Sequence, residues 1–166
     1  TETASITINA VNDAPVLENT GTMAFSAISE DSTTNTGNTV AEIIISSTVN
    51  SGNAITDVDS GAVEGIAITS ITDTNGTWQY YQTNTSAWTN LSTVIKNNAH
   101  LLLTTTNSIR FVPDADYNGS ITGGITFRAW DTTNGTAGDT MDTSPSNGGT
   151  TAFSIATETA SITINA

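Results

Sequence analysis

Five short segments of the sequence combine carboxylate or amide side chains with Gly, Asn or Pro, which are residues typical of tight turns. Carboxylates and backbone carbonyls in irregular acidic turns suit calcium, which takes about six to eight hard oxygen ligands. The chemistry predicted for these segments is therefore binding of a divalent cation. They are SEDST at 29–33, TDVDSG at 56–61, PDADYNG at 113–119, AWDTTNG at 129–135 and VNDAP at 11–15.

Asp57 and Asp59 form a D-x-D pair within the second segment. In extended backbone, side chains two residues apart point to the same side, so these carboxylates can share one ion or bracket two. A solvated acidic turn would give the same short pattern. The prediction therefore depends on the other acidic segments.

The net negative charge of the chain limits the kinds of partner that it can bind. Sixteen Asp and Glu residues face only Lys96, Arg110 and Arg128, which gives a formal net charge of −13. Such a chain repels phosphate backbones, which excludes a nucleic-acid partner. The acidity could serve solubility alone, but its concentration in turn-like segments favours cation binding.

The sequence is poorly supplied with catalytic groups. His100 is the only histidine, cysteine is absent, and nothing resembles a nucleophile elbow or a zinc-binding helix. A pair of carboxylates could act as the catalytic pair of a glycosidase. However, carboxylates that share a calcium ion can lie at the same distance from each other as such a catalytic pair. We therefore predict that the chain is not an enzyme.

Aromatic residues gather between positions 78 and 88. Exposed faces of Trp78, Tyr80 and Trp88 would form a platform for carbohydrate or protein binding. Tyr81 falls on the strand face opposite Trp78 and Tyr80, so one of the two sets can instead pack in a core. The binding platform is the alternative function, and core packing competes with it.

Apolar residues recur at every second position along much of the chain, as in Ile66 and Ile68 or Ile125 and Phe127. Turn residues such as Asn-Gly pairs separate the alternating runs. The pattern predicts an all-β sandwich. The expected strands cover residues 4–10, 23–28, 39–46, 66–70, 77–82, 101–105, 108–112, 125–129 and 150–165.

Residues 131–149 are polar, Gly-rich and without periodicity. They predict a long loop between the last two strands. Such a loop is either a contact surface for a ligand or an unstructured excursion.

The decapeptide TETASITINA occurs at residues 1–10 and again, unchanged, at residues 157–166. The spacing of 156 residues is that of an independent domain and not of a solenoid repeat. We therefore predict that residues 14–166 form one complete sandwich unit and that residues 1–13 are the last strand and linker of a preceding one. Adjacent identical repeats would be its partners in the same chain.

The order of the acidic segments resembles the cadherin repeat and the bacterial cadherin-like repeats of giant RTX-type adhesins. VNDAP resembles the interdomain linker of cadherins but is one Asn short, and PDADYNG stands in place of the cadherin L-D-R-E segment without its glutamate. The other matches are Glu30 with GNTV at 37–40, the D-A-D-like Asp57 and Asp59, and Asp131 at the end of FRAWD.

The resemblance implies a Greek-key β-sandwich of cadherin-like or Ig-like type, with Ca²⁺ as its cofactor at domain junctions. One pole would hold Asn12, Asp13, Asp57, Asp59 and Asp131. The opposite pole would hold Glu30, Asp114 and Asp116. It further implies a structural extender in a secreted adhesin of the bacterial cell surface, whose other domains contact a host or surface ligand. No apolar run approaches the length of a membrane span, so this segment is not expected to insert into a membrane.

Overall fold

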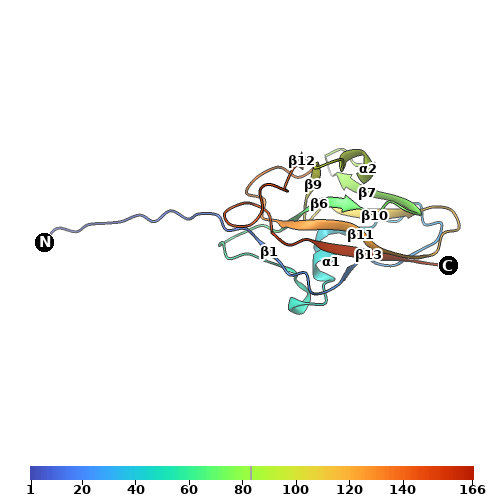
Figure 1. Ribbon diagram of the computed structural model, residues 1–166, viewed down its shortest axis with the longest axis horizontal. Coiled ribbons are helices and arrows are strands. Elements are labelled where there is room, and N and C mark those ends of the chain that lie inside the picture. The colour runs from blue at the N-terminus through green and yellow to red at the C-terminus, as the bar shows by residue number, and fades with distance from the viewer. Residues whose placement is uncertain (83) are drawn as a thin grey trace.

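The computed structural model describes residues 1–82 and 84–166. A β-rich body carries an N-terminal segment that extends away from it (Figure 1). Residues 1–10 are exposed throughout and form no strand. The strand expected there is absent because no partner strand lies beside it.

The body consists mainly of strands and is β-sandwich-like, as predicted. Within the described residues the helical elements are α1 (Val40–Ile45), α2 (Leu91–Val94) and a single 3-10 turn (Asn50–Gly52), and no helix is long and apolar enough to cross a membrane. The strands are β1 (Val16–Leu17), β2 (Met23–Ala24), β3 (Ile28–Ser29), β4 (Asn38–Thr39), β5 (Ile55–Thr56), β6 (Gly65–Ile71), β7 (Gly76–Gln82), β8 (Ala87–Asn90), β9 (His100–Thr104), β10 (Ser108–Pro113), β11 (Gly119–Trp130), β12 (Thr140–Met141) and β13 (Glu158–Asn165).

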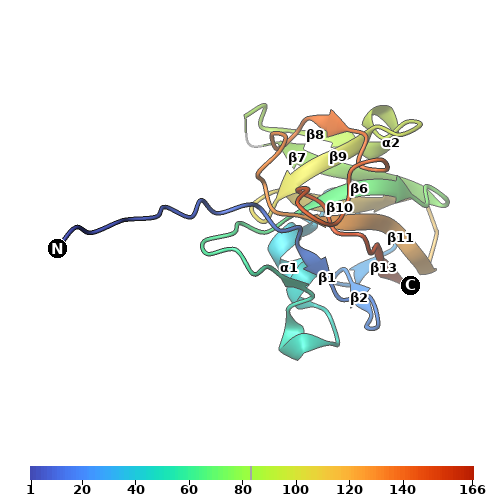
Figure 2. The ribbon, with the colours of Figure 1, turned by 60° about the vertical axis from the view of Figure 1, so that its left-hand side comes forward.

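Two sheets make up most of the body (Figure 2). The larger has the order β12-β9-β6-β11-β13-β2, and β3 also pairs with β13. Strand β11 runs antiparallel to both β6 and β13, whereas β13 pairs in parallel with β2 and β3. The smaller sheet has the order β4-β10-β7-β8, and β1 pairs separately with β5. Strands of only two residues therefore form both edges of the larger sheet.

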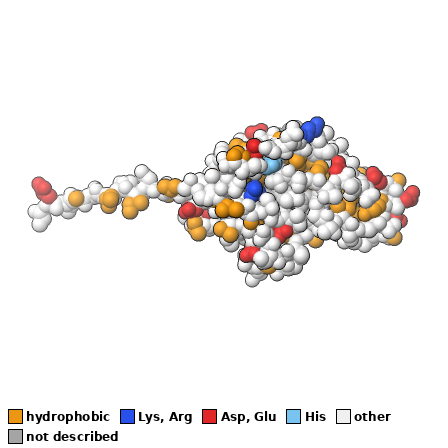
Figure 3. Space-filling model, viewed as in Figure 1, with side chains coloured by type: hydrophobic (Ala, Val, Ile, Leu, Met, Phe, Trp, Pro, Cys, Tyr) orange, Lys and Arg blue, Asp and Glu red, His pale blue; other side chains and the backbone are white. Residues whose placement is uncertain are grey.

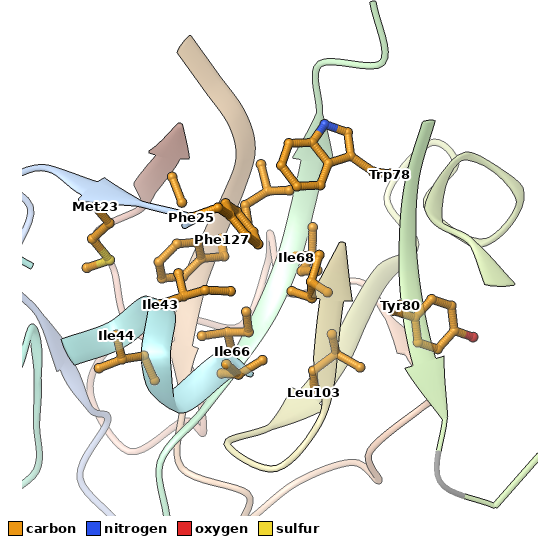
Figure 4. Packing of buried hydrophobic residues seen from close by; sticks show 14 of the residues in the cluster. Met23, Phe25, Ile43, Ile44, Ile66, Ile68, Trp78, Tyr80, Leu103 and Phe127 are labelled. Carbon is orange, nitrogen blue, oxygen red and sulfur yellow. The ribbon is translucent and has the colours of Figure 1, made fainter. Parts of the chain in front are cut away.

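The main hydrophobic core joins side chains of both sheets and of α1 (Figure 4). Trp78 and Tyr80, which alternate along β7, are 0% and 3% exposed. The Trp78 ring packs between Phe25 and Phe111, with ring centroids 4.8 Å and 4.9 Å away. Its Nε1 donates a hydrogen bond to the Thr72 carbonyl at 3.1 Å. Alternation along β7 thus selects the residues that fill the core.

The larger sheet is covered on its other face as well. Ala67 of β6, Leu102 of β9 and Trp130 of β11 form a second buried cluster with Ala152 and Phe153. Backbone hydrogen bonds of 2.8 Å and 3.0 Å tie Leu102 to residues 138 and 139. Residues 131–149 are therefore packed along the sheet and are not an unstructured excursion.

The strand predicted over residues 39–46 is wrong, because residues 40–45 form α1. Thr39 caps this helix: its Oγ1 accepts from the Glu42 N–H at 3.2 Å, while Glu42 Oε2 accepts from the Thr39 N–H at 2.8 Å. Val40, Ile43 and Ile44 are buried at helical spacing. This capping box satisfies two backbone donors and overrides the strand preference of the β-branched residues.

Replacing Thr39 by alanine is expected to lower the free energy of unfolding by about 1 kcal/mol, since one capping acceptor is lost. For a chain of this size the midpoint of thermal unfolding should fall by roughly 2–4 °C. Circular dichroism melts measure the shift, with the exposed loop substitution Thr34→Ala as control. Equal midpoints for the two variants would contradict the role of the cap.

Two further predicted strands are shorter than expected. Of residues 150–165 only Glu158–Asn165 forms β13, because residues 150 and 151 continue a turn that begins at Gly148 and Gly149, both at positive φ. The run 23–28 gives only β2 and the first residue of β3. Apolar alternation therefore located these strands but not their ends.

His100 begins β9 and is 6% exposed. Its Nδ1 lies 2.7 Å from Thr143 Oγ1 and accepts from the Thr143 N–H at 3.2 Å. Burial lowers the pKa of His100 from its ordinary 6.5, against a smaller opposing effect of Asp142.

This shift makes stability depend on pH. The unfolded chain binds the proton of His100 more readily than the folded chain does, so the stability contributed by the neutral imidazole is lost as the pH falls below about 6.5. We expect the unfolding midpoint to be lower at pH 5 than at pH 7. The difference should shrink in His100→Gln, and an unchanged difference would refute this origin.

Candidate metal centre

Three segments far apart in the sequence meet where the N-terminal segment joins the body. We call this region the linker pole, and it consists of Asn12 and Asp13 of the incoming chain, Asp57 and Asp59 after β5, and Asp131 after β11. Asn12 Nδ2 donates to Asp131 Oδ2 at 2.8 Å, and the Asp13 N–H donates to Asp59 Oδ2 at 2.8 Å. Hydrogen bonds therefore join the five residues predicted to share a pole in two sets, Asn12 with Asp131, and Asp13 with Asp59 and Asp57.

The D-x-D pair is ordered by its own backbone. Asp57 Oδ1 accepts a hydrogen bond from the Asp59 N–H at 2.9 Å, which closes a turn directly after β5. This contact fixes the direction of the Asp57 carboxylate and leaves its second oxygen for another partner. Asp57 and Asp59 are both half-buried.

Asp131 is the most buried member of the linker pole, at 3% exposed. Its Oδ1 accepts from the N–H and the hydroxyl of Thr133, at 2.8 Å and 2.6 Å, and its Oδ2 accepts from Asn12. The Asn12 amide also reaches the Thr151 carbonyl at 3.2 Å. Asn12 thus fastens the linker to the end of β11.

One buried carboxylate oxygen of the linker pole has no hydrogen-bond partner in the part of the chain that the structure describes. Asp57 Oδ2 is buried and makes no hydrogen bond. A cavity of about 170 Å³ opens beside it, lined by Asp57, Asp59, Glu64 and Asp131 among other residues. A buried carboxylate oxygen without a partner is costly, and a cation is the kind of group that would satisfy it.

The donor set fits calcium, because it consists of carboxylates and an amide without a nitrogen or sulfur ligand. Among the residues that the structure describes, no three Asp, Glu or His side chains are gathered closely enough to form a metal site as they stand. Hydrogen bonds from the Asn12 amide and the Asp13 backbone occupy two of the carboxylates instead. Closing the site around an ion would require these contacts to rearrange.

The arginines do not neutralise this pole. Arg110 lies over the Trp88 ring at 4.2 Å and donates to Gln79 and to the Asn35 carbonyl. Arg128 donates to the carbonyls of Ser154 and Ile155. Acidic side chains are visible along the body in Figure 3, where basic ones are few. The negative charge of the linker pole is therefore left for a bound cation or solvent ions.

A second acidic group, the distal pole, lies where β13 ends, at the opposite end of the body from the N-terminal segment (Figure 1). Asn118 Nδ2 donates to Glu30 Oε2 at 2.9 Å, and the Asp116 N–H donates to Asp31 Oδ1 at 3.2 Å. Asp114 precedes Asp116 in the same turn. The predicted Glu30, Asp114 and Asp116 thus belong to two neighbouring loops.

Sequence reasoning missed two acidic residues as candidates. Asp31 joins the distal pole and has a positive φ of 62°, which carboxylate and amide residues tolerate better than most. Glu64 lines the cavity of the linker pole and accepts from Asn53 Nδ2 at 3.1 Å. Both lie within five residues of a predicted ligand, and this closeness in sequence could have identified them as candidates.

The proposed aromatic platform is not formed. Trp78 and Tyr80 are buried in the core, and their faces are closed to a ligand. Trp88 is half-buried on β8, where Tyr81 lies 5.2 Å away and Arg110 covers the ring. These three residues therefore do not share an exposed surface.

No protein-family model, curated protein or solved structure matches this chain.

Proposed function

We infer that this chain is one repeat of a tandem array, a calcium-stabilised extender in a large secreted adhesin of the bacterial cell surface. Its architecture would be the Greek-key sandwich of cadherin-like and Ig-like domains. The observation that carries the proposal is the buried, partnerless Oδ2 of Asp57 beside the cavity of the linker pole. A carboxylate placed in this way favours a bound cation over a purely solvated acidic turn.

Calcium would join the linker to the body. Asp57, Asp59 and Asp131 supply carboxylates from the body, while Asn12 and Asp13 supply amide, carbonyl and carboxylate oxygens from the incoming chain. Bound calcium supplies positive charge that neutralises carboxylates which otherwise repel one another. The chain's own residues hold the linker against the ends of β5 and β11, and this fixes the direction in which the preceding repeat leaves.

Exposed apolar side chains around the same pole support a junction between repeats. Val11, Val58 and Val63 are 66%, 81% and 51% exposed, and Val11 and Val63 line a further hollow there with Asp59 and Asp131. Apolar side chains beside an acidic site are unfavourable on a free surface but suited to contact with a neighbouring domain. The identical decapeptides at 1–10 and 157–166 indicate that this neighbour is another copy of the same repeat.

Calcium titration by isothermal calorimetry tests the proposal on the chelated chain. We expect saturable binding that magnesium displaces poorly, because the irregular set of oxygens suits the larger ion. Binding at the linker pole should be lost in Asp57→Ala and retained in Asp73→Asn, which removes an exposed charge from the turn between β6 and β7. Identical titrations of the two variants would refute calcium at the linker pole.

A further inference from the structure

The repeated decapeptide exists in two environments within one molecule. In β13, Ile162 and Ile164 are 3% and 2% exposed, whereas the corresponding Ile6 and Ile8 of the N-terminal copy are each 86% exposed. The ten residues are otherwise the same in type and order. The N-terminal copy is thus a strand sequence that exposes two large apolar side chains.

The position that this sequence fills in the sheet is defined on three sides. Strand β11 pairs with β13 along one edge, from Gly119 opposite Ile164 to Phe127 opposite Glu158. Strands β2 and β3 pair with the other edge, and the core receives Ala160 and Ile162. We call this place the β13 position.

Further contacts at the β13 position also come from residues that the decapeptide contains. Ser161 Oγ accepts from the Gly123 N–H at 3.1 Å, and its carbonyl accepts from the Phe25 N–H at 2.8 Å. The Asn165 carbonyl accepts from the Glu30 N–H at 2.7 Å. The N-terminal copy carries the same side chains in the same order, so it can make each of these bonds.

The N-terminal copy cannot reach the β13 position of its own molecule. Strand β13 ends beside Glu30 at the distal pole, so a substituting strand would place Ala10 there. The Ala14 N–H is bonded to the Gly149 carbonyl near the start of the body, where the linker enters. An eight-residue strand is about 26 Å long, whereas the four residue steps from 10 to 14 span at most about 14 Å.

We propose that residues 1–10 of one molecule can take the β13 position of a second copy whose own β13 is weakened or displaced, as a strand added between β11 and the pair β2 and β3. Main-chain pairing and the two buried isoleucines supply the affinity, as in other cases of strand addition. The donor's linker then leaves the acceptor at its distal pole, so the linker pole of one copy faces the distal pole of the next. This contact is head-to-tail and propagates into a ring or an open filament.

The molecule's own β13 competes with such an incoming strand. Because β13 is tethered, its effective concentration is on the order of millimolar, and an identical strand from solution displaces little of it at micromolar protein. Replacing Ile162 and Ile164 by threonine keeps strand preference but removes two buried apolar side chains. This should weaken the tethered strand on the order of a hundredfold and leave the N-terminal copy as the better ligand.

Sedimentation velocity of the full chain tests the proposal with matched variants. Ile162→Thr/Ile164→Thr should form dimers and larger species at concentrations on the order of 100 µM. The fourfold variant, which adds Ile6→Thr/Ile8→Thr, exposes the same β13 position but lacks a strong donor and should remain at the 17.1 kDa monomer mass. Ile6→Thr/Ile8→Thr alone should be monomeric with an unchanged unfolding midpoint, since Ile6 and Ile8 are exposed.

A synthetic TETASITINA peptide provides a readout that does not depend on assembly. Added to the fourfold variant, it should bind with saturation by fluorescence anisotropy and raise the unfolding midpoint, or restore the strand signal in circular dichroism if the variant is unfolded alone. A scrambled peptide should do neither. Equal masses for the double and fourfold variants, or equal effects of the two peptides, would overturn the proposal. The measurements are made in chelator, so their outcome is independent of calcium binding.

Discussion

Calcium is expected to raise the midpoint of thermal unfolding of the chelated chain by roughly 5–10 °C. An ion that binds only the folded state adds about 2.7 kcal/mol when its free concentration is 100 times the dissociation constant. The binding free energy is gained at the linker pole, where Asp57 Oδ2 lacks a partner in the chain alone. Differential scanning fluorimetry in calcium and in chelator measures the increment.

Asp57→Asn separates this effect from a general loss of structure. Asparagine retains the oxygen that accepts from the Asp59 N–H but carries no charge. The variant should unfold in chelator within a few degrees of the parent, and its midpoint should no longer rise with calcium. Asp73→Asn should behave as the parent in both conditions. A full calcium response of Asp57→Asn would contradict calcium binding at this carboxylate.

Trp78→Ala is expected to lower the free energy of unfolding by about 3–5 kcal/mol, because it empties a large volume between the two sheets. The ring is 0% exposed and packs on Phe25 and Phe111. It also lies against the backbone of β11, where a Cβ atom on Gly124 would come within 2.4 Å of the indole. Neighbouring strands therefore cannot close the cavity without moving.

Trp88→Ala provides the matched control for this prediction. The Trp88 ring is half-buried between Tyr81 and Arg110 on the smaller sheet, outside the main core, and its removal should cost about 1 kcal/mol. Urea denaturation of both variants, followed by circular dichroism, measures the difference in unfolding free energy. Equal losses would contradict the division between a core tryptophan and a surface one.

Much of the sheet structure follows from alternation along the sequence. The runs of β6, β7, β9, β10 and β11 were located because their apolar residues recur at every second position or form short buried runs. The β-branched residues of α1 predict a strand, whereas the capping box formed by Thr39 and Glu42 starts a helix. The strand preference of single residues therefore gives the wrong conformation where a capping pair at the helix start favours a helix.

The positions of the linker-pole residues were predicted more completely than the ends of the strands. The resemblance of the acidic segments to the cadherin repeat implied that Asn12, Asp13, Asp57, Asp59 and Asp131 would share one pole, although Asn12 and Asp131 are separated by 119 residues. The spacing could not reveal that hydrogen bonds of Asn12 and Asp13 would occupy carboxylates of the body. Such contacts depend on side-chain directions, which only the assembled fold sets.

The limit of local reasoning is clearest in the decapeptide. Residues 157–166 contain a full strand and residues 1–10 contain none, although the two sequences are the same. Alternation predicts which side chains would be buried if a strand formed. Whether the strand forms depends on the presence of β11, β2 and β3 beside it.

The two-residue strands at the edges of the larger sheet limit edge-to-edge aggregation between neighbouring copies. In the proposed array, many copies of the same sheet would lie close together on a cell surface, which favours lateral aggregation through unpaired strand edges. Strand β12 at one edge, and β2 and β3 at the other, offer little regular backbone for a neighbouring sheet to extend. The long strands that could template aggregation, β11 and β13, lie inside the sheet. Strand β11 is flanked by β6 and β13, and the outer edge of β13 is paired in part by β2 and β3.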